Sequence, residues 1–188
     1  MDSELIAPKA QGEKSIAQYY GRLVFRQIFV QSDGREDEFF LFGSKHIPVI
    51  VFALTGKNEV IAVRQFRYGA NCFVIETPGG NIKGEITEEN IRETAIAELL
   101  EETGYRAETI ISVGPPTWFD PASFRVTFFP VLALNCEKIA EPTPGRTEII
   151  ETVLIPLDKW IEMVRRGEIC DSKTLAMTLF VLLYLKEV

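Results

Sequence analysis

This chain of 188 residues contains little histidine and little cysteine. Its one histidine, His46, argues against a histidine-rich metal site and against a serine–histidine catalytic arrangement. Its three cysteines, Cys72, Cys136 and Cys170, match neither the spacing of a zinc site nor a disulfide framework. We therefore expect free thiols in a protein of a reducing compartment.

The sequence also lacks an excess of basic residues and an apolar run of membrane-spanning length. The net charge is −7 at pH 7, whereas a nucleic-acid backbone requires a basic face. The longest apolar run, residues 175–185, is too short to cross a membrane, and the first residues form no basic-then-apolar leader. We expect a cytoplasmic protein without nucleic-acid or membrane partners. A small phosphorylated ligand stays compatible with this charge, because a metal ion and a few arginines can neutralise it locally.

The composition itself is that of a globular protein, with 46% hydrophobic and 25% charged residues. The length suits one domain with a substantial core. Residues 1–15 are polar and are expected to form a flexible N-terminal segment, and residues 16–188 a single domain.

Hydrophobic patterns predict a series of strands. Residues 22–31 and 38–42 flank Asp33-Gly34, a strong turn signal, and predict an N-terminal β-hairpin. The continuous apolar run 47–54 is typical of a strand buried on both faces. Further strands are expected at 59–66, 72–77, 109–113, 124–134 and 152–155. With helices expected at 88–103, at 159–166 and near the C-terminal end, the pattern predicts an α/β fold, an α/β/α sandwich around a mixed β-sheet.

The most informative stretch is residues 76–105, which predicts a strand end, a Pro-Gly-Gly turn and an amphipathic helix. Thr87 is a suitable N-cap with acidic residues after it, and Gly104 is a suitable residue to end the helix. Glu98, Glu101 and Glu102 share one face of this helix because of their spacing of three and four. Hard carboxylate ligands of this kind suit Mg²⁺, although a solvated acidic face is the simpler alternative.

The run Ala97-Glu98-Leu99-Leu100-Glu101-Glu102-Thr103-Gly104-Tyr105 resembles the second half of the Nudix box, Arg-Glu-apolar-x-Glu-Glu-x-Gly-apolar. Pro78-Gly79-Gly80 resembles the glycine turn that opens this box. The resemblance implies that Glu98, Glu101 and Glu102 bind Mg²⁺, or Mn²⁺, against a substrate diphosphate. It also implies that a box glutamate such as Glu102 orients or deprotonates the attacking water.

The sequence departs from the box in two places. Ala97 stands where the family has an arginine that supports the box through salt bridges, and Arg92 is a nearby candidate to replace it. Glu85 lies six residues after Gly79 but thirteen before Glu98, whereas Glu89 lies nine before Glu98 but ten after Gly79. Four additional residues between turn and helix, with Glu89 in the family's position, are the simplest explanation, and Glu85 stays the alternative.

Gln65-Phe66-Arg67-Tyr68, followed by Glu76-Thr77-Pro78-Gly79-Gly80, resembles a second marker, that of ADP-ribose pyrophosphatase-like Nudix proteins. It implies that Arg67 contacts phosphate and that Glu76, Gly79 and Gly80 lie beside the substrate. A guanidinium suits a diphosphate because it donates two parallel hydrogen bonds. The alternative for Arg67 is a surface arginine at a strand end, and Phe66 and Tyr68 are either base-stacking or core residues.

Two later segments carry further candidates. Trp118, in the proline-rich loop 114–123, either stacks on a nucleobase or lines the edge of the domain. The family resemblance implies that the loop before strand 152–155 supplies a catalytic glutamate, for which Glu148 aligns best and Glu151 is second. The alternative is two solvated acids at a strand edge.

Taken together, these residues predict Mg²⁺-dependent hydrolysis of a nucleotide sugar, ADP-ribose or another ADP-sugar, to a nucleoside monophosphate and a sugar phosphate. A GDP-sugar is the nearest competing substrate, and a degenerate Nudix domain that binds nucleotide without turnover is the alternative outside the enzymes. The resemblance implies a homodimer with the N-terminal strands, residues 22–43, in its interface. A hairpin that closes a monomer explains those strands equally well.

Overall fold

The computed structural model describes residues 6–145 and 148–187, which form two compact units. The first unit comprises the chain up to His46 together with Trp118–Val126, and the second comprises Ile47–Thr117 together with the chain from Thr127 onward. The strands of the first unit are β1 (Lys9–Tyr19), β2 (Arg22–Val30), β3 (Glu36–Ser44) and β11 (Phe124–Arg125). The short strand β10 (Thr117–Trp118) lies at the junction.

The first unit is a four-stranded sheet in the order β1-β2-β3-β11. β1, β2 and β3 are antiparallel, and β11 runs parallel to β3. The predicted hairpin is therefore part of a larger sheet. The segment expected to be flexible up to residue 15 instead forms most of β1, which is exposed at all 11 residues. Its composition did not indicate a strand because backbone pairing with β2, rather than side-chain burial, holds it.

The second unit contains the remaining elements. Its strands are β4 (Pro48–Thr55), β5 (Glu59–Arg67), β6 (Cys72–Glu76), β7 (Gly79–Asn81), β8 (Tyr105–Arg106), β9 (Thr109–Ser112), β12 (Thr127–Lys138) and β13 (Ile150–Pro156). Its helices are α1 (Glu88–Thr103), α2 (Leu157–Arg165) and α3 (Ser172–Glu187).

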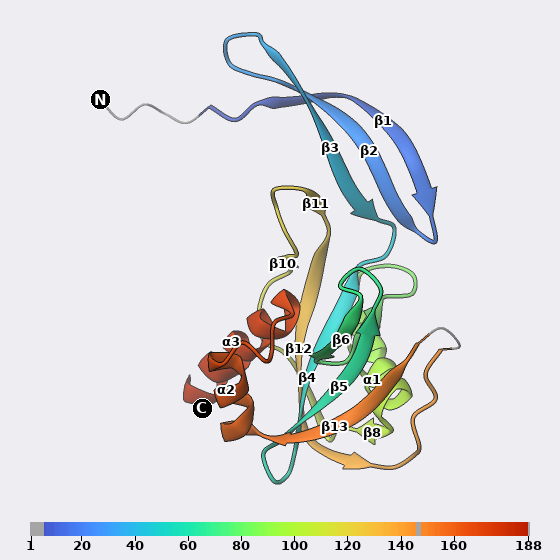
Figure 1. Ribbon diagram of the computed structural model, residues 1–188, viewed down its shortest axis with the longest axis vertical. Helices are drawn as coiled ribbons and strands as arrows, with labels where there is room; N and C mark the ends of the chain where they lie inside the picture. Colours follow the sequence, from blue (N-terminus) through green and yellow to red (C-terminus); the bar gives the residue numbers. More distant parts are fainter. Residues whose placement is uncertain (1–5, 146–147, 188) are drawn as a thin grey trace. The chain divides into compact units, whose positions relative to one another are not determined.

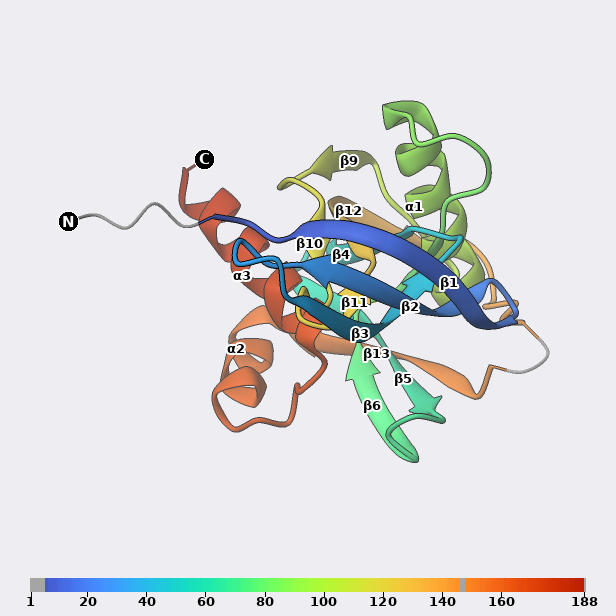
Figure 2. The ribbon, with the colours of Figure 1, turned by 90° about the horizontal axis from the view of Figure 1, so that it is seen from above.

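The sheet of the second unit is mixed, because β12 is parallel to β4 whereas β4 with β5 and β5 with β13 are antiparallel. Helix α1 covers one face, and α2 and α3 cover the other (Figures 1 and 2). The predicted α/β/α sandwich around a mixed sheet is therefore confirmed. Among the described residues, no helix is long and apolar enough to cross a membrane.

Each face of the sheet has its own apolar core, and the run predicted to be buried on both faces, β4, supplies residues to both. On the α1 side, Ile91, Ala95 and Leu99 of the helix pack against Val49 and Val51. On the opposite side, the ring of Trp160 in α2 meets Phe52 edge to face, and the indole N–H donates to Thr178 of α3 at 2.9 Å. The sheet is thus held rigidly between the helices.

Both predicted ends of α1 are confirmed. The hydroxyl of Thr87 accepts the N–H of Asn90, and Gly104 adopts a left-handed conformation with φ 76° while its N–H donates to the carbonyl of Leu100. A side chain at Gly104 would overlap the carbonyl oxygen of Ala140, so glycine is required there for packing as well as for φ. This end of the helix lies two residues from Glu102 and fixes its position.

One predicted strand has different bounds in the structure. Residues 124–134 were expected to form one strand, but Phe124–Arg125 is β11 of the first unit and β12 continues from Thr127 to Lys138. The sequence does not mark this division, because only Val126 separates the two segments and no turn residue lies between them.

Candidate functional site

The turn between β6 and β7 is held by hydrogen bonds to neighbouring elements. The carbonyl of Pro78 accepts the N–H of Val51 in β4 at 2.8 Å. The N–H of Gly79 donates to Oε2 of Glu102 in α1 at 3.0 Å. The glycine turn and the acidic face of the helix are therefore joined directly.

The two glycines of this turn leave room for different neighbours. A Cβ at Gly79 would overlap the carbonyl oxygen of Val49 in β4. A Cβ at Gly80 would overlap the carboxyl group of Glu98. The backbone of the turn can approach the sheet and the helix closely only because both residues lack side chains.

Glu102 is buried, with 6% of its surface exposed. Burial first, and then the charges of Glu98 and Glu148, raise the pKa of its carboxyl group to about 8, although the hydrogen bond from the Gly79 N–H and the charge of Arg67 act to lower it. A carboxylate in this position lacks sufficient positive charge nearby. A divalent cation would supply that charge.

Glu98 is half-buried on the same side of α1. Its pKa is raised by burial first and then by the charges of Glu101 and Glu148, while Lys83 lowers it. Glu101 itself is exposed. The charge of Glu148, a residue that follows Glu102 by 46 positions in the sequence, acts on both Glu98 and Glu102.

Glu148 and Glu151 differ in where the chain directs them. The Oε2 atom of Glu148 accepts the N–H of Gly145 at 2.7 Å, which folds the loop before β13, and its charge acts on Glu98. Glu151 instead forms an ion pair with Arg64 of β5 at 2.8 Å.

The register of β13 separates Glu151 from the box glutamates. The hydroxyl of Thr152 donates to the carbonyl of Glu102 at 3.3 Å, so Thr152 faces α1. Successive side chains on a strand point to opposite faces, and Glu151 therefore faces away from α1. Of the two predicted catalytic glutamates, Glu148 alone is brought to the acidic face.

Arg67 and Glu76 form an ion pair across the β5–β6 hairpin. The guanidinium donates from Nε at 2.7 Å and from Nη2 at 2.6 Å to the two oxygens of Glu76, which is 2% exposed. This hydrogen bonding to Glu76 raises the pKa of Arg67, and the charge of Glu102 adds to the effect. Glu76 thus orients Arg67, whose half-exposed guanidinium keeps donors for an anionic ligand.

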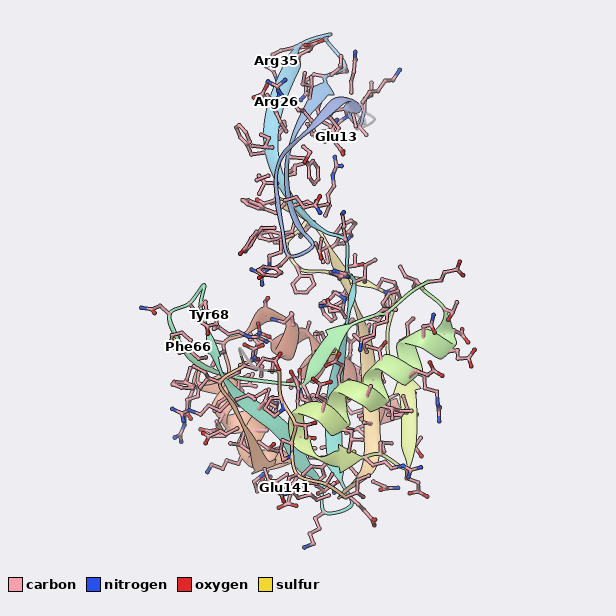
Figure 3. All side chains as sticks on the ribbon, turned by 90° about the vertical axis from the view of Figure 1, so that its right-hand side faces the viewer. Glu13, Arg26, Arg35, Phe66, Tyr68 and Glu141 are labelled. Carbon is pink, nitrogen blue, oxygen red and sulfur yellow. The ribbon has the colours of Figure 1, made fainter. Side chains whose placement is uncertain are left out.

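The three aromatic candidates, Phe66, Tyr68 and Trp118, each have contacts of their own. Phe66 and Tyr68 pack edge to face at 5.4 Å, at the free end of the β5–β6 hairpin (Figure 3). Tyr68 is 71% exposed, so it is not a core residue. Phe66 alternates with Arg67 along β5 and points to the opposite face of the sheet. Trp118 belongs to the first unit, where it lines a cavity with Phe29 and other residues. Its predicted role in base stacking stays a prediction.

The two candidates for the first box glutamate, Glu85 and Glu89, are both exposed. The carbonyl of Glu85 accepts the side-chain N–H of Asn90 at 2.8 Å, which closes the loop before α1. Glu89 lies in the first turn of α1, nine residues before Glu98, and this spacing puts the two residues on opposite sides of the helix. Neither residue joins the glutamate group in this arrangement.

Comparison with known proteins agrees with this geometry. The sequence matches the profile of the NUDIX domain over residues 44–176, which is most of the chain. The chain belongs to the Nudix family. Relatives include the methanol dehydrogenase activator of Bacillus methanolicus, 30% identical over 130 residues, and the ADP-ribose pyrophosphatase of Bacillus subtilis, 30% identical over 129 residues. Each of these matches covers 67% of this chain and 66% of the relative, just under two thirds of its length.

One further relative and one solved structure are also similar to this Nudix protein. The GDP-mannose pyrophosphatase of Salmonella typhimurium is 30% identical over 129 residues, covering 64% of this chain and 65% of that protein. The crystal structure of an ADP compounds hydrolase superposes with a TM-score of 0.83, covering 99% of this chain and 98% of that one. At 18% identity, this likeness shows that the two proteins share their fold.

The Nudix family uses a divalent metal, and the donor chemistry of the glutamate group fits one. Glu98, Glu102 and Glu148 offer only carboxylate oxygens, and the pKa of Glu98 and of Glu102 is raised partly by the other carboxylates. Within residues 6–145 and 148–187, however, no three acidic, histidine or cysteine side chains are close enough to form a ready-made metal cage. Mg²⁺ keeps several of its waters, so carboxylates that repel one another need not all contact it directly.

Lys83 is a site residue that the sequence patterns did not identify. It lines a cavity of about 180 Å³ together with Ala97 and Glu98, and its charge lowers the pKa of Glu98. It therefore places a positive charge beside the cavity that Ala97 and Glu98 line. A lysine in a loop carries no motif, so only the fold could reveal it. The sequence candidate for this role, Arg92, is exposed on α1.

We predict that Gly80→Ala will weaken Mg²⁺ binding with little loss of stability. The new Cβ displaces the carboxyl group of Glu98, which is the far end of a flexible side chain. Isothermal titration should show an affinity for Mg²⁺ reduced by about tenfold, and urea denaturation a free energy of unfolding within about 1 kcal/mol of wild type. Gly56→Ala is the control, because nothing lies within 4 Å of its Cβ. Unchanged Mg²⁺ affinity in Gly80→Ala would contradict the arrangement.

We also predict that the free energy of unfolding of chelator-treated protein falls as pH rises, and that Glu102→Gln makes this fall smaller. The pKa of Glu102 is about 8 in the folded protein and 4.5 in a model peptide, so the folded state retains a proton that the unfolded chain has released. The contribution of Glu102 is fully present below 4.5 and is lost as pH rises through 8, at about 1.4 kcal/mol per pH unit. Urea denaturation from pH 4.5 to 9 should show a shallower decline for the variant. Parallel profiles would contradict the burial of this carboxyl group.

Proposed function

We propose that this Nudix protein is a pyrophosphohydrolase that cleaves the diphosphate of a nucleotide sugar in the presence of Mg²⁺. The observation that carries the proposal is the convergence of Glu98, Glu102 and Glu148 beside the Gly79-Gly80 turn. Bound Mg²⁺, or Mn²⁺, would be held by Glu98, Glu101 and Glu102, and would neutralise the diphosphate oxygens.

Residues outside the glutamate group bind and position the diphosphate in the proposed reaction. Arg67, oriented by Glu76, binds a diphosphate oxygen through its free donors. Gly79 and Gly80 allow the turn to approach β4 and Glu98 closely, which places the backbone of the turn beside the proposed diphosphate site. Water attacks one phosphorus in line, the bridging P–O bond breaks, and the sugar or nucleoside phosphate leaves.

Glu148 is the general base of the proposed reaction. It takes the proton of the attacking water while the new P–O bond forms, and the products are a nucleoside monophosphate and a sugar phosphate. Its place in the loop before β13 allows it to approach as substrate binds. Glu102, which the resemblance to the Nudix box also implies for this role, is the second candidate.

ADP-ribose or another ADP-sugar is the preferred substrate, and a GDP-sugar is the alternative. Among the relatives, one is named for ADP-ribose and others for GDP-mannose at the same 30% identity. A domain that binds nucleotide without turnover is the alternative outside the enzymes, and the substitution Ala97 for arginine favours it. The cysteines Cys72, Cys136 and Cys170 are free, which supports a cytoplasmic location.

The experiment that tests this function is product release from a panel comprising ADP-ribose, GDP-mannose, a dinucleotide and ATP, with and without Mg²⁺. We expect Mg²⁺-dependent release of AMP from ADP-ribose. Glu148→Gln should lower kcat by about 10²-fold or more, because it removes the base. Glu151→Gln is the matched control and should leave kcat within a few fold, since Glu151 pairs with Arg64 on the opposite face.

Several outcomes would change the conclusion. Cleavage of GDP-mannose in preference to ADP-ribose would reassign the substrate. No cleavage by folded protein with either Mg²⁺ or Mn²⁺ would favour the binding domain, whose nucleotide affinity should survive Glu101→Gln and Glu102→Gln. Equal effects of the two glutamate variants at 148 and 151 would remove Glu148 as the base.

We further propose a homodimer with the first unit in its interface. β1 is exposed along its whole length, and Phe39, Phe40 and Phe42 of β3 are 41–60% exposed. A strand without burial gains little stability within one chain, and large exposed apolar patches commonly mark interfaces. Light scattering after gel filtration should give twice the mass of the 21.2 kDa chain, and Phe40→Lys should shift it toward monomer. A monomeric wild type at micromolar concentration would contradict the dimer.

A further inference from the structure

We propose that the first turn of α3 positions the residues of the diphosphate site, and that Thr174 and Lys173 are its positioning residues. Thr174 fixes the strand end that leads into the glycine turn, and Lys173 fixes the Arg67–Glu76 pair. The inference rests on the proposed function, because it assigns these residues to the same diphosphate site.

The first contact is a buried hydrogen-bond chain between α3 and the segment before the turn. The N–H of Thr77 donates to the hydroxyl of Thr174 at 3.1 Å, across 97 positions of sequence. That hydroxyl donates in turn to Oδ2 of Asp171 at 2.9 Å, and Asp171 also accepts the backbone N–H of Thr174 as the helix cap. Thr174 is fully buried and Thr77 is 5% exposed, so water cannot replace the hydroxyl as acceptor for the Thr77 N–H.

The second contact carries charge. The ammonium of Lys173 pairs with Asp171 and lies 3.8 Å from Oε2 of Glu76, the oxygen that also accepts from Arg67. Glu76 is thus flanked by two cations, and Asp171 balances the second of them. These contacts hold the carboxylate of Glu76 from both sides, and that carboxylate in turn orients the guanidinium of Arg67.

These contacts surround one cavity. A hollow of about 370 Å³ is lined by Arg67, Glu76, Asp171 and Lys173, among other residues. Its walls come from the β5–β6 hairpin and from the start of α3, which are far apart in the sequence. The residues that position Arg67 therefore line the same cavity as Arg67 itself.

The turn is consequently held at two amides. At one end, Thr77 donates to Thr174, and two residues later Gly79 donates to Glu102. Because only Pro78 separates them, a shift of Thr77 moves the amide that faces the buried carboxyl group. Catalytic rates respond strongly to displacements of this size, since about 1 Å can cost roughly a hundredfold.

The test compares two isosteric changes in α3. Thr174→Val removes the hydroxyl that accepts from Thr77. Thr178→Val, one helical turn later, removes an equally buried hydroxyl that accepts from Trp160 and donates to the carbonyl of Thr174. Thr174→Val loses the contacts of its hydroxyl with the N–H of Thr77, the hydroxyl of Thr77 and Asp171, and Thr178→Val loses two contacts. Losses of stability of the same order are expected, whereas only Thr174→Val disturbs the turn.

We expect Thr174→Val to lower kcat for the nucleotide sugar by about tenfold or more, Thr178→Val to leave it within twofold, and Thr174→Ser to restore it. Lys173→Met should raise KM more than it lowers kcat, because Glu76, the partner that orients Arg67, loses its second cation, and Lys173→Arg should rescue it. Equal kcat in the two valine variants would overturn the proposal.

Amide hydrogen exchange gives a readout that does not depend on turnover. Thr174→Val should speed exchange at both Thr77 and Gly79 by at least about tenfold relative to Thr178→Val. If wild type hydrolyses nothing, the proposed function fails, and this exchange pattern alone decides whether α3 positions the turn. If wild type hydrolyses substrate but exchange at Gly79 is unchanged in Thr174→Val, the positioning role is wrong while the proposed function stands. If Thr174→Val does not fold, the Lys173 variants and their kcat and KM values decide.

Discussion

The hydrogen bond from the Gly79 N–H to the carboxyl group of Glu102 is the contact on which the second unit depends. It joins the turn after β6 to a helix that starts eight residues later, and it does so at a carboxyl group almost wholly removed from water. Such a group is unfavourable in its charged form unless donors or a cation surround it. The glycines, the capped helix and the sheet beneath them all serve to supply the donor and to leave room for a cation.

The helix itself could be predicted almost to the residue, and the reason is that its signals are local. Thr87 as cap, Gly104 as terminator and the apolar stripe through Leu99 each act within a few residues of chain. The buried strand β4 was equally accessible, because a strand covered on both faces needs a continuous apolar run. The local spacing of Glu98, Glu101 and Glu102 predicted their shared face, whereas their role as metal ligands came from the resemblance to the Nudix box.

Other parts could not be read from the sequence, because they depend on pairing between distant segments. β1 is polar and exposed, so only its ladder with β2 makes it a strand. The choice between Glu148 and Glu151 needed the register of β13 against β5, since one residue reverses the face. Thr174 carries no local signal of its role, because its contact with Thr77 spans 97 positions.

The division of the chain into two units has a topological consequence. Because the short segment Trp118–Val126 leaves the second unit to supply β11 and then returns, the backbone passes between the units at three points rather than one. A gene fragment that stops after His46 would encode β1, β2 and β3, and β3 would lack its neighbour β11. A fragment that begins after His46 would contain Trp118–Val126 without the sheet to which this segment belongs. Each fragment would therefore contain strand segments whose partner lies in the other fragment, so the sheet of the first unit is complete only in the continuous chain.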